Sequence, residues 1–213
     1  KQNLHWVNVY KCTCPQKNTK LYESLVSPIL AYGAGIWGTS SYNSVNTIQN
    51  RACRFFLGLG STASNCASRG DMGWVSPQCR QIIEVLRLYH RSENIEPHRI
   101  NGIVHRYCKR LNYRSLWINR VDSLFRRIGY DHKANTDIHS GIYIDRYKRF
   151  AKQHDQEVWY HSLFNDAGCE NGNKLRLYRL YKDRLDTEEY VHSNHINRYQ
   201  RSVLARLRSG SLP

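Results

Sequence analysis

Apolar residues recur at the three- and four-residue spacing of an α-helix in nearly every readable segment of this chain. The first such series contains Leu21, Leu25 and Ile29, each one helical turn beyond the last. A half-buried strand would instead alternate apolar and polar residues. Pro28 interrupts this series, and because proline lacks an N–H group we expect a kink or break near Ser27. The spacing therefore predicts an all-α protein.

Local start and stop signals predict the individual helices. Gly58 and Gly60 mark the stop of a helix expected at 43–59, and Pro77 leads into the next one. Residues 60–73, rich in Ser, Asn and Gly, are expected to form a loop between these two helices and are the best candidate for a hinge. The other expected helices are 100–111, 115–128, one long helix or two over 143–164, 175–185 and a last helix that stops at Gly210.

Several of these helices pair an apolar side with a basic side, and the apolar side of such a helix normally faces a core. From the first of these helices to the last, the apolar sides are Val45, Ile48, Ala52, Phe55, Phe56 and Leu59; Ile100, Ile103, Val104, Tyr107 and Leu111; Trp117, Val121, Leu124, Phe125 and Ile128; and Val203, Leu204 and Leu207.

The charge balance is strongly positive, with 32 Lys and Arg against 17 Asp and Glu in 213 residues, a formal net charge of +15. Such a field attracts polyanions, and nucleic acid is the first interpretation; anionic lipid, acidic proteins or a solvated surface without a ligand are the alternatives. No segment approaches the ~20 apolar residues of a membrane span, and the N-terminal residues lack the apolar core of a signal peptide. We expect a soluble, intracellular protein, nuclear or cytoplasmic, that does not enter a membrane.

The densest basic region is 98–133, which holds nine Lys or Arg and two Asp. Tyr107, Tyr113 and Trp117 are interleaved with these cations, as in surfaces that hold a phosphate backbone and stack on unpaired bases. We expect Tyr107 and Trp117 to face the core and Tyr113, between two helices, to be more open. The residues predicted to contact phosphate are Arg51, Arg54, Arg106, Lys109, Arg110, Arg126, Arg127, Arg201 and Arg208.

Carboxylates are sparse, which argues against a polymerase or two-metal nuclease centre. The adjacent pair Glu188 and Glu189 is expected near the start of the last helix, where negative charge stabilises the helix dipole. Asp183, Asp186 and Glu189 could share one helical side, and they are the remaining candidates for a metal-dependent nuclease.

The cysteines, histidines and glycines also lack the spacing of known metal-binding and cofactor-binding motifs. Cys12 and Cys14 are too close for a zinc knuckle, and His192 and His195 have no matching further ligands. The glycines do not form a phosphate-binding loop. We therefore expect no metal, no cofactor and no catalysis by this chain alone.

Four stretches of the sequence resemble one family. They read LYESLVSPILAYGAGIWG, IQNRACRFFLGLG, GDMGWVSPQCRQIIEVLRLYHR and, at the end, RYQRSVLARLRSGSLP. Together they are similar to the region just downstream of the palm in LINE-type non-LTR retrotransposon reverse transcriptases, namely the thumb and the C-terminal region after it. The resemblance covers roughly residues 19–111 and 190–213.

This resemblance implies an organisation and a function. It divides the chain into an unmatched segment at 1–18, a thumb-like helical domain at 19–128, a polar linker at 129–141 and a basic helical C-terminal region at 142–213, truncated before the family's cysteine cluster. The intact parent would copy RNA into DNA, but its palm, fingers and endonuclease are absent here. The chain would grip the backbone of RNA, DNA or an RNA–DNA hybrid, with the missing polymerase domains as a further partner.

Two other interpretations remain open. The chain could be a domesticated helical module that docks on a partner protein and whose charge keeps it in solution. It could also be a decayed retrotransposon reading frame that does not fold stably.

Overall fold

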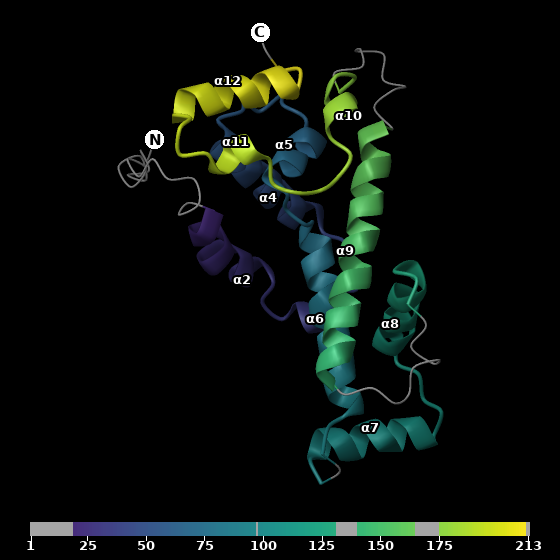
Figure 1. Ribbon diagram of the computed structural model, residues 1–213. Helices are drawn as coiled ribbons and strands as arrows, with labels where there is room; N and C mark the ends of the chain where they lie inside the picture. The colour runs from purple at the N-terminus through teal and green to yellow at the C-terminus, as the bar shows by residue number, and fades with distance from the viewer. Residues whose placement is uncertain (1–18, 97, 131–139, 165–174, 212–213) are drawn as a thin grey trace. The chain divides into compact units, whose positions relative to one another are not determined.

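The computed structural model describes residues 19–96, 98–130, 140–164 and 175–211. Every regular element in these ranges is a helix (Figure 1), which confirms the all-α class. The elements are the π-helix η2 (Tyr22–Val26) and the α-helices α2 (Ser27–Leu30), α3 (Ala34–Trp37), α4 (Asn43–Leu57), α5 (Asn65–Met72), α6 (Pro77–Glu93), α7 (Ile100–Arg110), α8 (Leu116–Arg127), α9 (Ser140–Phe164), α10 (Tyr178–Tyr181), α11 (Glu189–His192) and α12 (Arg198–Arg208). A helix with the length and apolar character needed to cross a membrane does not occur among the described residues.

The described chain forms two compact units, each built from separate stretches of sequence. The terminal unit comprises Lys1–Leu30, Thr47–Trp74 and Trp159–Pro213, and the central unit comprises Ala31–Asn46 and Val75–Val158. The predicted linker at 129–141 falls inside the central unit, and its residues 131–139 lie outside the described part. Tyr130 is buried in the core of this unit.

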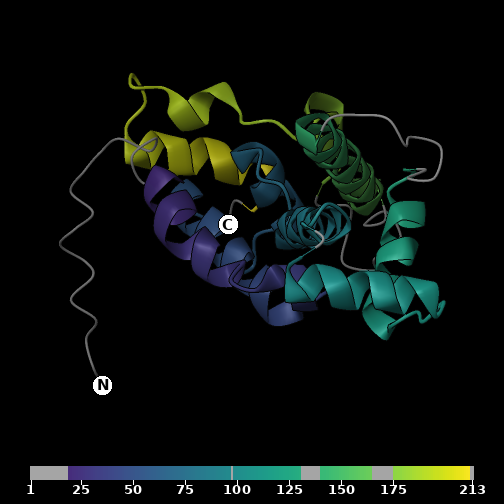
Figure 2. The same ribbon diagram turned by 90° about the horizontal axis from the view of Figure 1, so that it is seen from below.

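The core of the central unit lies between α6, α8 and α9, and Figures 1 and 2 show these helices beside one another with α7 across the end of α6. The buried side of α8 is the one that its helical spacing predicts, centred on Val121, Leu124 and Phe125. The short helix α3 packs closely on α6, because a Cβ at Gly38 would lie 2.9 Å from the Cβ of Gln81.

Four of the described helices begin at a side chain that accepts a backbone N–H. Ser64, Ser76 and Ser115 cap α5, α6 and α8, and the Ser76 hydroxyl lies 3.0 Å from the amide nitrogen of Cys79. Asn197 and Gln200 form a reciprocal capping box at the start of α12. These serines and the asparagine satisfy N–H groups that the first helical turn leaves unpaired.

Five of the described helices end in the same left-handed turn, in which two further backbone N–H groups close on the last carbonyls. Glycine takes the left-handed position after α4, α5, α8 and α12, with φ values between +62° and +71°. After α7 the position is taken by Asn112, with a φ of +51°. Asparagine tolerates this conformation better than other residues with a side chain.

The chain does not break at Pro28. The helix continues through this region and changes from π-helical to α-helical geometry at Ser27, whose N–H bonds the carbonyl of Tyr22. The expected irregularity is therefore a change of helix type, which is a recognised source of kinks.

The loop and hinge predicted at 60–73 are wrong for most of this segment, because residues Asn65–Met72 form the helix α5 in the terminal unit. Its polar residues suggested a solvent-exposed loop, yet Ser68, Gly70 and Asp71 are all buried. The backbone can be helical here because Ser64 caps the start and Gly73, at a φ of +63°, ends it. The polar side chains are tolerated because they find partners inside the unit.

The principal partner set surrounds Asp71, which is only 1% exposed. Its carboxylate accepts hydrogen bonds from the hydroxyls of Tyr178 (2.9 Å) and Tyr190 (2.6 Å) and forms an ion pair with Arg208 (3.3 Å). Burial raises the pKa of Asp71, against the opposing effect of these three partners. Burial together with Asp71 also raises the pKa of both tyrosines, so their hydroxyls remain donors. We refer to Asp71, Tyr178, Tyr190 and Arg208 as the Asp71 cluster.

Two predicted helix faces are displaced in the terminal unit. On α4 the buried side is centred on Gln49, Cys53 and Leu57, whereas Ile48 and Phe55 are exposed. On α12 the predicted apolar side, Val203, Leu204 and Leu207, is exposed, and the buried residues are Arg201 and Ala205. The helix turns this side inward because the guanidinium finds backbone carbonyls there and alanine permits a close approach.

The helix predicted at 175–185 is reduced to the single turn of α10. After it, Lys182 adopts an extended conformation with a φ of −129°. Its buried ammonium group donates to the carbonyl of Asp186 at 2.7 Å and pairs with Glu188 at 2.7 Å. Charge pairing within a short segment, from Lys182 to Glu188, takes the place of the helical hydrogen bonds that the periodicity suggested.

Asp71→Ala is expected to destabilise the protein by about 1–3 kcal/mol, because it removes the acceptor of Tyr190 and one acceptor each of Tyr178 and Arg208, which keep the Ala67 carbonyl and Glu188. Asp71→Asn should cost less, because the side-chain oxygen of asparagine can still accept hydrogen bonds from the tyrosine hydroxyls. Burial also disfavours a charged group at this position, which is why the pKa of Asp71 is raised. Urea unfolding followed by circular dichroism measures both. Asp183→Ala, at an exposed position, is the control, and equal losses for Asp71→Ala and this control would contradict the role of the cluster.

Gly70→Ala should cost about 1–3 kcal/mol, the range for overpacking a core. A Cβ at Gly70 would lie 2.7 Å from Cζ2 of the buried Trp159 and against the hydroxyl of Tyr178. Gly60→Ala is the matched control, because nothing lies within 4 Å of a Cβ at that position. Thermal unfolding of both variants checks the expectation, and a Gly70→Ala protein as stable as the control would refute the close packing.

Candidate nucleic-acid interface

The nine predicted phosphate contacts divide between the two units. Arg51, Arg54, Arg201 and Arg208 belong to the terminal unit, and Arg106, Lys109, Arg110, Arg126 and Arg127 belong to the central unit. The structure therefore gathers five of the nine in one compact unit, on α7 and α8.

Arg201 is an interior residue, only 4% exposed. Its guanidinium donates to three backbone carbonyls, those of Tyr190 (3.3 Å), Ser193 (3.3 Å) and Ile196 (3.0 Å). These bonds fasten α12 to the segment that contains α11. The guanidinium is fully engaged within the fold, and we do not include Arg201 in the proposed interface.

Arg208 is also engaged by the fold. It pairs with Asp71 and, at 3.1 Å, with Glu188, and its guanidinium lies 5.7 Å from the ring centroids of both Tyr178 and Tyr190. Partial burial opposes its charge, but Asp71 and Glu188 raise the pKa of Arg208 overall. We therefore leave Arg208 out of the interface as well.

The two predicted residues on α4 differ in their surroundings. Arg51 is exposed, while Arg54 is half-buried and donates a hydrogen bond to the side-chain oxygen of Asn65. Arg54 thereby links α4 to the start of α5. Of the four predicted residues in the terminal unit, all of them described, Arg51 alone combines exposure with the absence of an assigned structural role.

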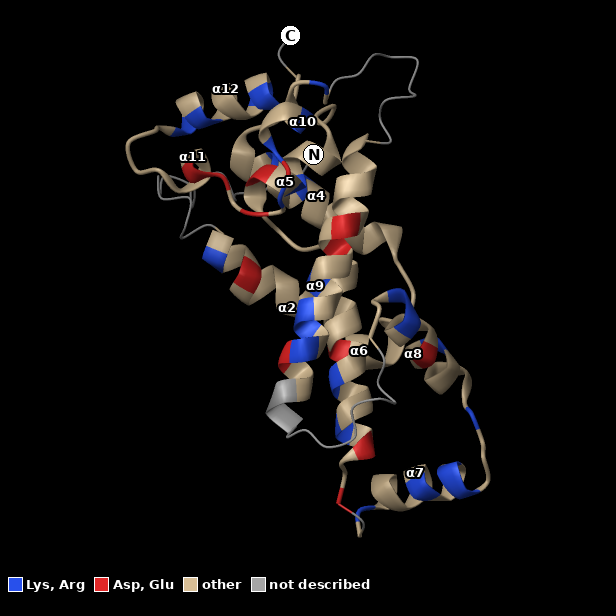
Figure 3. Cartoon of the chain, turned by 45° about the vertical axis from the view of Figure 1, so that its right-hand side comes forward, with Lys and Arg blue, Asp and Glu red and all other residues tan. Residues whose placement is uncertain are grey.

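The helix α7 carries three cations, Arg106, Lys109 and Arg110, toward its C-terminal end (Figure 3). All of α7 is described, and Gly102 is its only buried residue. Lys109 and Arg110 are exposed on its last turn, and Arg106 is half-buried one turn earlier. Lys109 pairs with Glu93 of α6, which also bonds His105 at 3.1 Å, so the helix is tied to α6 through one carboxylate.

On α8 the two predicted arginines lie in the last turn and are exposed. The Arg126 guanidinium donates to the Ser123 hydroxyl at 3.3 Å, a bond within its own helix. Arg99 and Arg114 are exposed cations that the prediction missed. Their position inside the basic region 98–133 was the signal that could have identified them.

The apolar side predicted for α7 is exposed rather than buried. Ile100 is 77% exposed, and Ile103, Tyr107 and Leu111 are each more than half exposed. Tyr107, which we expected to face the core, therefore points outward, while Tyr113 at 65% exposure is open as expected. The inward side of the helix is formed instead by Gly102, which lies against Ile95 and Glu96 in the connection from α6, and by His105, which contacts Glu93 of α6.

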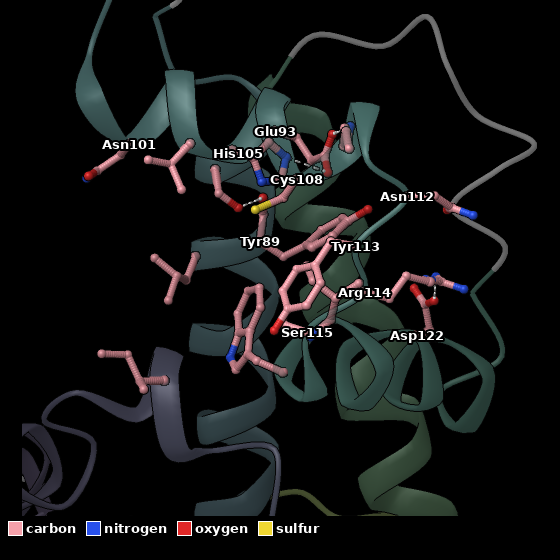
Figure 4. Close-up of a pocket in the computed structure, with 17 residues that line it drawn as sticks. Tyr89, Glu93, Asn101, His105, Cys108, Asn112, Tyr113, Arg114, Ser115 and Asp122 are labelled. Atoms are coloured by element: carbon pink, nitrogen blue, oxygen red, sulfur yellow. Dashed lines mark hydrogen bonds and ion pairs between the residues drawn. The ribbon is translucent and has the colours of Figure 1, made fainter.

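A groove lies between α6, α7 and α8 within the central unit, with a volume of about 640 Å³ (Figure 4). Its apolar lining includes Tyr89, Val104 and Trp117. The Trp117 indole is fixed by a 3.0 Å hydrogen bond from Nε1 to the carbonyl of Gly35. Tyr113 lies at the edge that leads to α8. We call this feature the α6–α8 groove.

No group of three or more His, Cys, Asp or Glu among the described residues is arranged to hold a metal ion. Asp183, Asp186 and Glu189 accordingly do not form a metal site, and Asp186 pairs with Lys182 instead. Glu188, expected near the start of the last helix, precedes α11 and pairs with Lys182 and Arg208. Asp186 and Glu188 stabilise the terminal unit by charge pairing.

Comparison of the chain with models of known protein families, with curated proteins and with solved structures finds no match.

Arg201→Ala should lower the free energy of unfolding by about 1–3 kcal/mol, because it leaves buried carbonyls without their donor. Arg198→Ala on the same helix is the matched control, since Arg198 is exposed and its only described contact is a guanidinium 5.6 Å from the Phe55 ring. Denaturant unfolding of the two variants distinguishes a structural arginine from a surface one. A loss no larger than that of the control would contradict the interior role of Arg201.

Proposed function

We propose that the central unit binds the sugar-phosphate backbone of nucleic acid through α7, the α7–α8 connection and α8. The observation that carries this proposal is the charge of residues 98–130, which contain eight Lys or Arg and a single carboxylate, Asp122. That carboxylate is itself paired with Arg114. Cations that meet phosphates fix the position of a nucleic acid without reading its sequence.

The wider role that we propose is that of the thumb and C-terminal region of a LINE-type non-LTR reverse transcriptase. The sequence resemblance at 19–111 and 190–213 supports it, and so does an all-α fold with a cationic helix surface. The ligand would be template and primer as RNA, DNA or an RNA–DNA hybrid. The chain would act without catalysis of its own, and the polymerase domains would supply the chemistry.

Binding should be strongly salt-dependent. If about five phosphates are neutralised, the logarithm of the association constant falls with the logarithm of the salt concentration at a slope near −4 to −5 on duplex DNA. Fluorescence anisotropy with a labelled duplex, between about 50 and 200 mM salt, measures this slope. Absence of binding at the lower salt concentration would refute the proposal.

Removing charge from α7 should make the slope shallower, that is, less negative by about one for each phosphate contact that is lost. The test variant is Arg110→Gln, which changes an exposed residue at the end of α7. The matched control is Arg184→Gln, an exposed arginine of the terminal unit outside the predicted set. Equal slopes for the two variants would place the phosphate contacts elsewhere.

A second function is favoured by one observation, the exposed apolar side of α7 at Ile100, Ile103, Tyr107 and Leu111. Such a side is typical of a surface that docks on a partner protein. Association with a protein in a pull-down that is insensitive to salt and carries no nucleic acid would support the interaction module over the proposed function. A cooperative thermal transition in circular dichroism would exclude the decayed reading frame.

A further inference from the structure

The apolar lining of the α6–α8 groove takes no part in the proposed phosphate contacts, although Lys109 and Arg114 stand at its rim. Its volume of about 640 Å³ lies within the ~300–1,000 Å³ range of small-molecule sites. Tyr89 and Trp117, whose ring centroids are 6.5 Å apart at an interplanar angle of 36°, give it an aromatic wall. A wall of this composition suits a flat, apolar-faced ligand.

The carboxylates that line the groove are matched by cations of the protein. Glu93 pairs with Lys109 and His105, and Asp122 pairs with Arg114 (Figure 4). The negative charges of Glu93 and Asp122 are therefore compensated and do not repel a phosphate that approaches the rim. The side chains of Lys109 and Arg114 are 58% and 54% exposed, so each can contact a phosphate on its solvent side while it stays paired with its carboxylate.

The position of Tyr113 is fixed by the turn that ends α7. Asn112 adopts the left-handed conformation, its N–H bonds the carbonyl of Lys109 at 3.0 Å, and the N–H of Tyr113 bonds the carbonyl of Cys108 at 2.9 Å. The ring of Tyr113 lines the groove while remaining 65% exposed. Because the backbone at Tyr113 is already fixed, stacking of a base on the ring has to order only the side chain.

We infer that the α6–α8 groove receives an unpaired nucleobase, which stacks on Tyr113 while the adjoining phosphates lie on Lys109, Arg110 and Arg114. The inference rests on the proposed function and adds to it a preference for single strands. Cationic side chains border the aromatic wall at the end of α7 and again before α8, and this charge complements a base attached to a polyanion better than an apolar peptide. Stacking of this kind tolerates any base.

The test compares the full chain on two labelled single strands of equal length by fluorescence anisotropy at low salt. One strand is oligothymidine, and the other is an abasic strand with the same phosphates and no bases. The wild-type protein should bind oligothymidine about 5- to 100-fold more tightly, the effect expected for stacking of one base. Tyr113→Ala should bring this ratio close to one and leave affinity for the abasic strand unchanged, whereas Tyr113→Phe, which keeps the ring, should preserve the ratio.

Tyr107→Ala is the matched control, because Tyr107 is similarly exposed at 60% on α7 but does not line the groove. It should leave the ratio at the wild-type value. Circular dichroism confirms that each variant is folded, as expected for changes at exposed positions.

The outcomes separate this inference from the function on which it rests. If the wild-type protein binds both strands equally, or if Tyr113→Ala keeps the wild-type ratio, the base site is refuted and backbone binding stands. If the wild-type protein binds neither strand nor duplex, the proposed function fails and the base site fails with it.

Discussion

A single buried carboxylate organises the terminal unit. Asp71 lies on α5, and its three partners come from α10, α11 and α12, which are far from α5 in sequence. Taking a carboxylate out of water is costly, and the cost is offset only when hydrogen bonds and an opposite charge converge on it. The late helices also place Tyr178, Val191 and Ala205 in the apolar cores of the unit. The polar bonds to Asp71 and those of Arg201 add to this apolar burial and attach the same three helices.

How far the sequence predicts this molecule depends on whether the relevant information is local. The positions of α4, α6, α7, α8 and α9 follow from helical spacing, serine caps and glycine stops, all of which act within a few residues. The helix α5 could not be predicted in this way, because a run containing Ser68, Gly70 and Asp71 is stable only when distant tyrosines and Arg208 surround it. The same reason explains α12, where the spacing of Val203 and Leu207 indicates one face and the carbonyl partners of Arg201 select another.

The arginines of this chain serve two physical roles that composition does not separate. Arg201 and Arg110 each contribute one charge to the net charge of +15. The guanidinium of Arg201 is hydrogen-bonded to backbone oxygens, whereas Arg110 is exposed to water. The number of cations available to a polyanion is thus smaller than the number in the sequence. Whether a cation remains available to a polyanion depends on how far carboxylates and carbonyls of the fold engage it, and its position on a helical wheel does not decide this. The sequence therefore predicts the candidate site as a region, 98–133, and the fold is needed to select the cations within it that remain exposed.

The sparse burial of α7 has a consequence for its dynamics. A helix with one buried residue along its described length, tied to its unit by Glu93 and by the turn at Asn112, contributes little to the core and can open locally at a free energy below that of global unfolding. A ligand that binds the closed form would draw this equilibrium toward order by mass action. The amide hydrogens of α7 would then exchange rapidly in the free protein and slowly in its complex, so that the surface offered for recognition is also the part of the central unit whose order responds to occupancy.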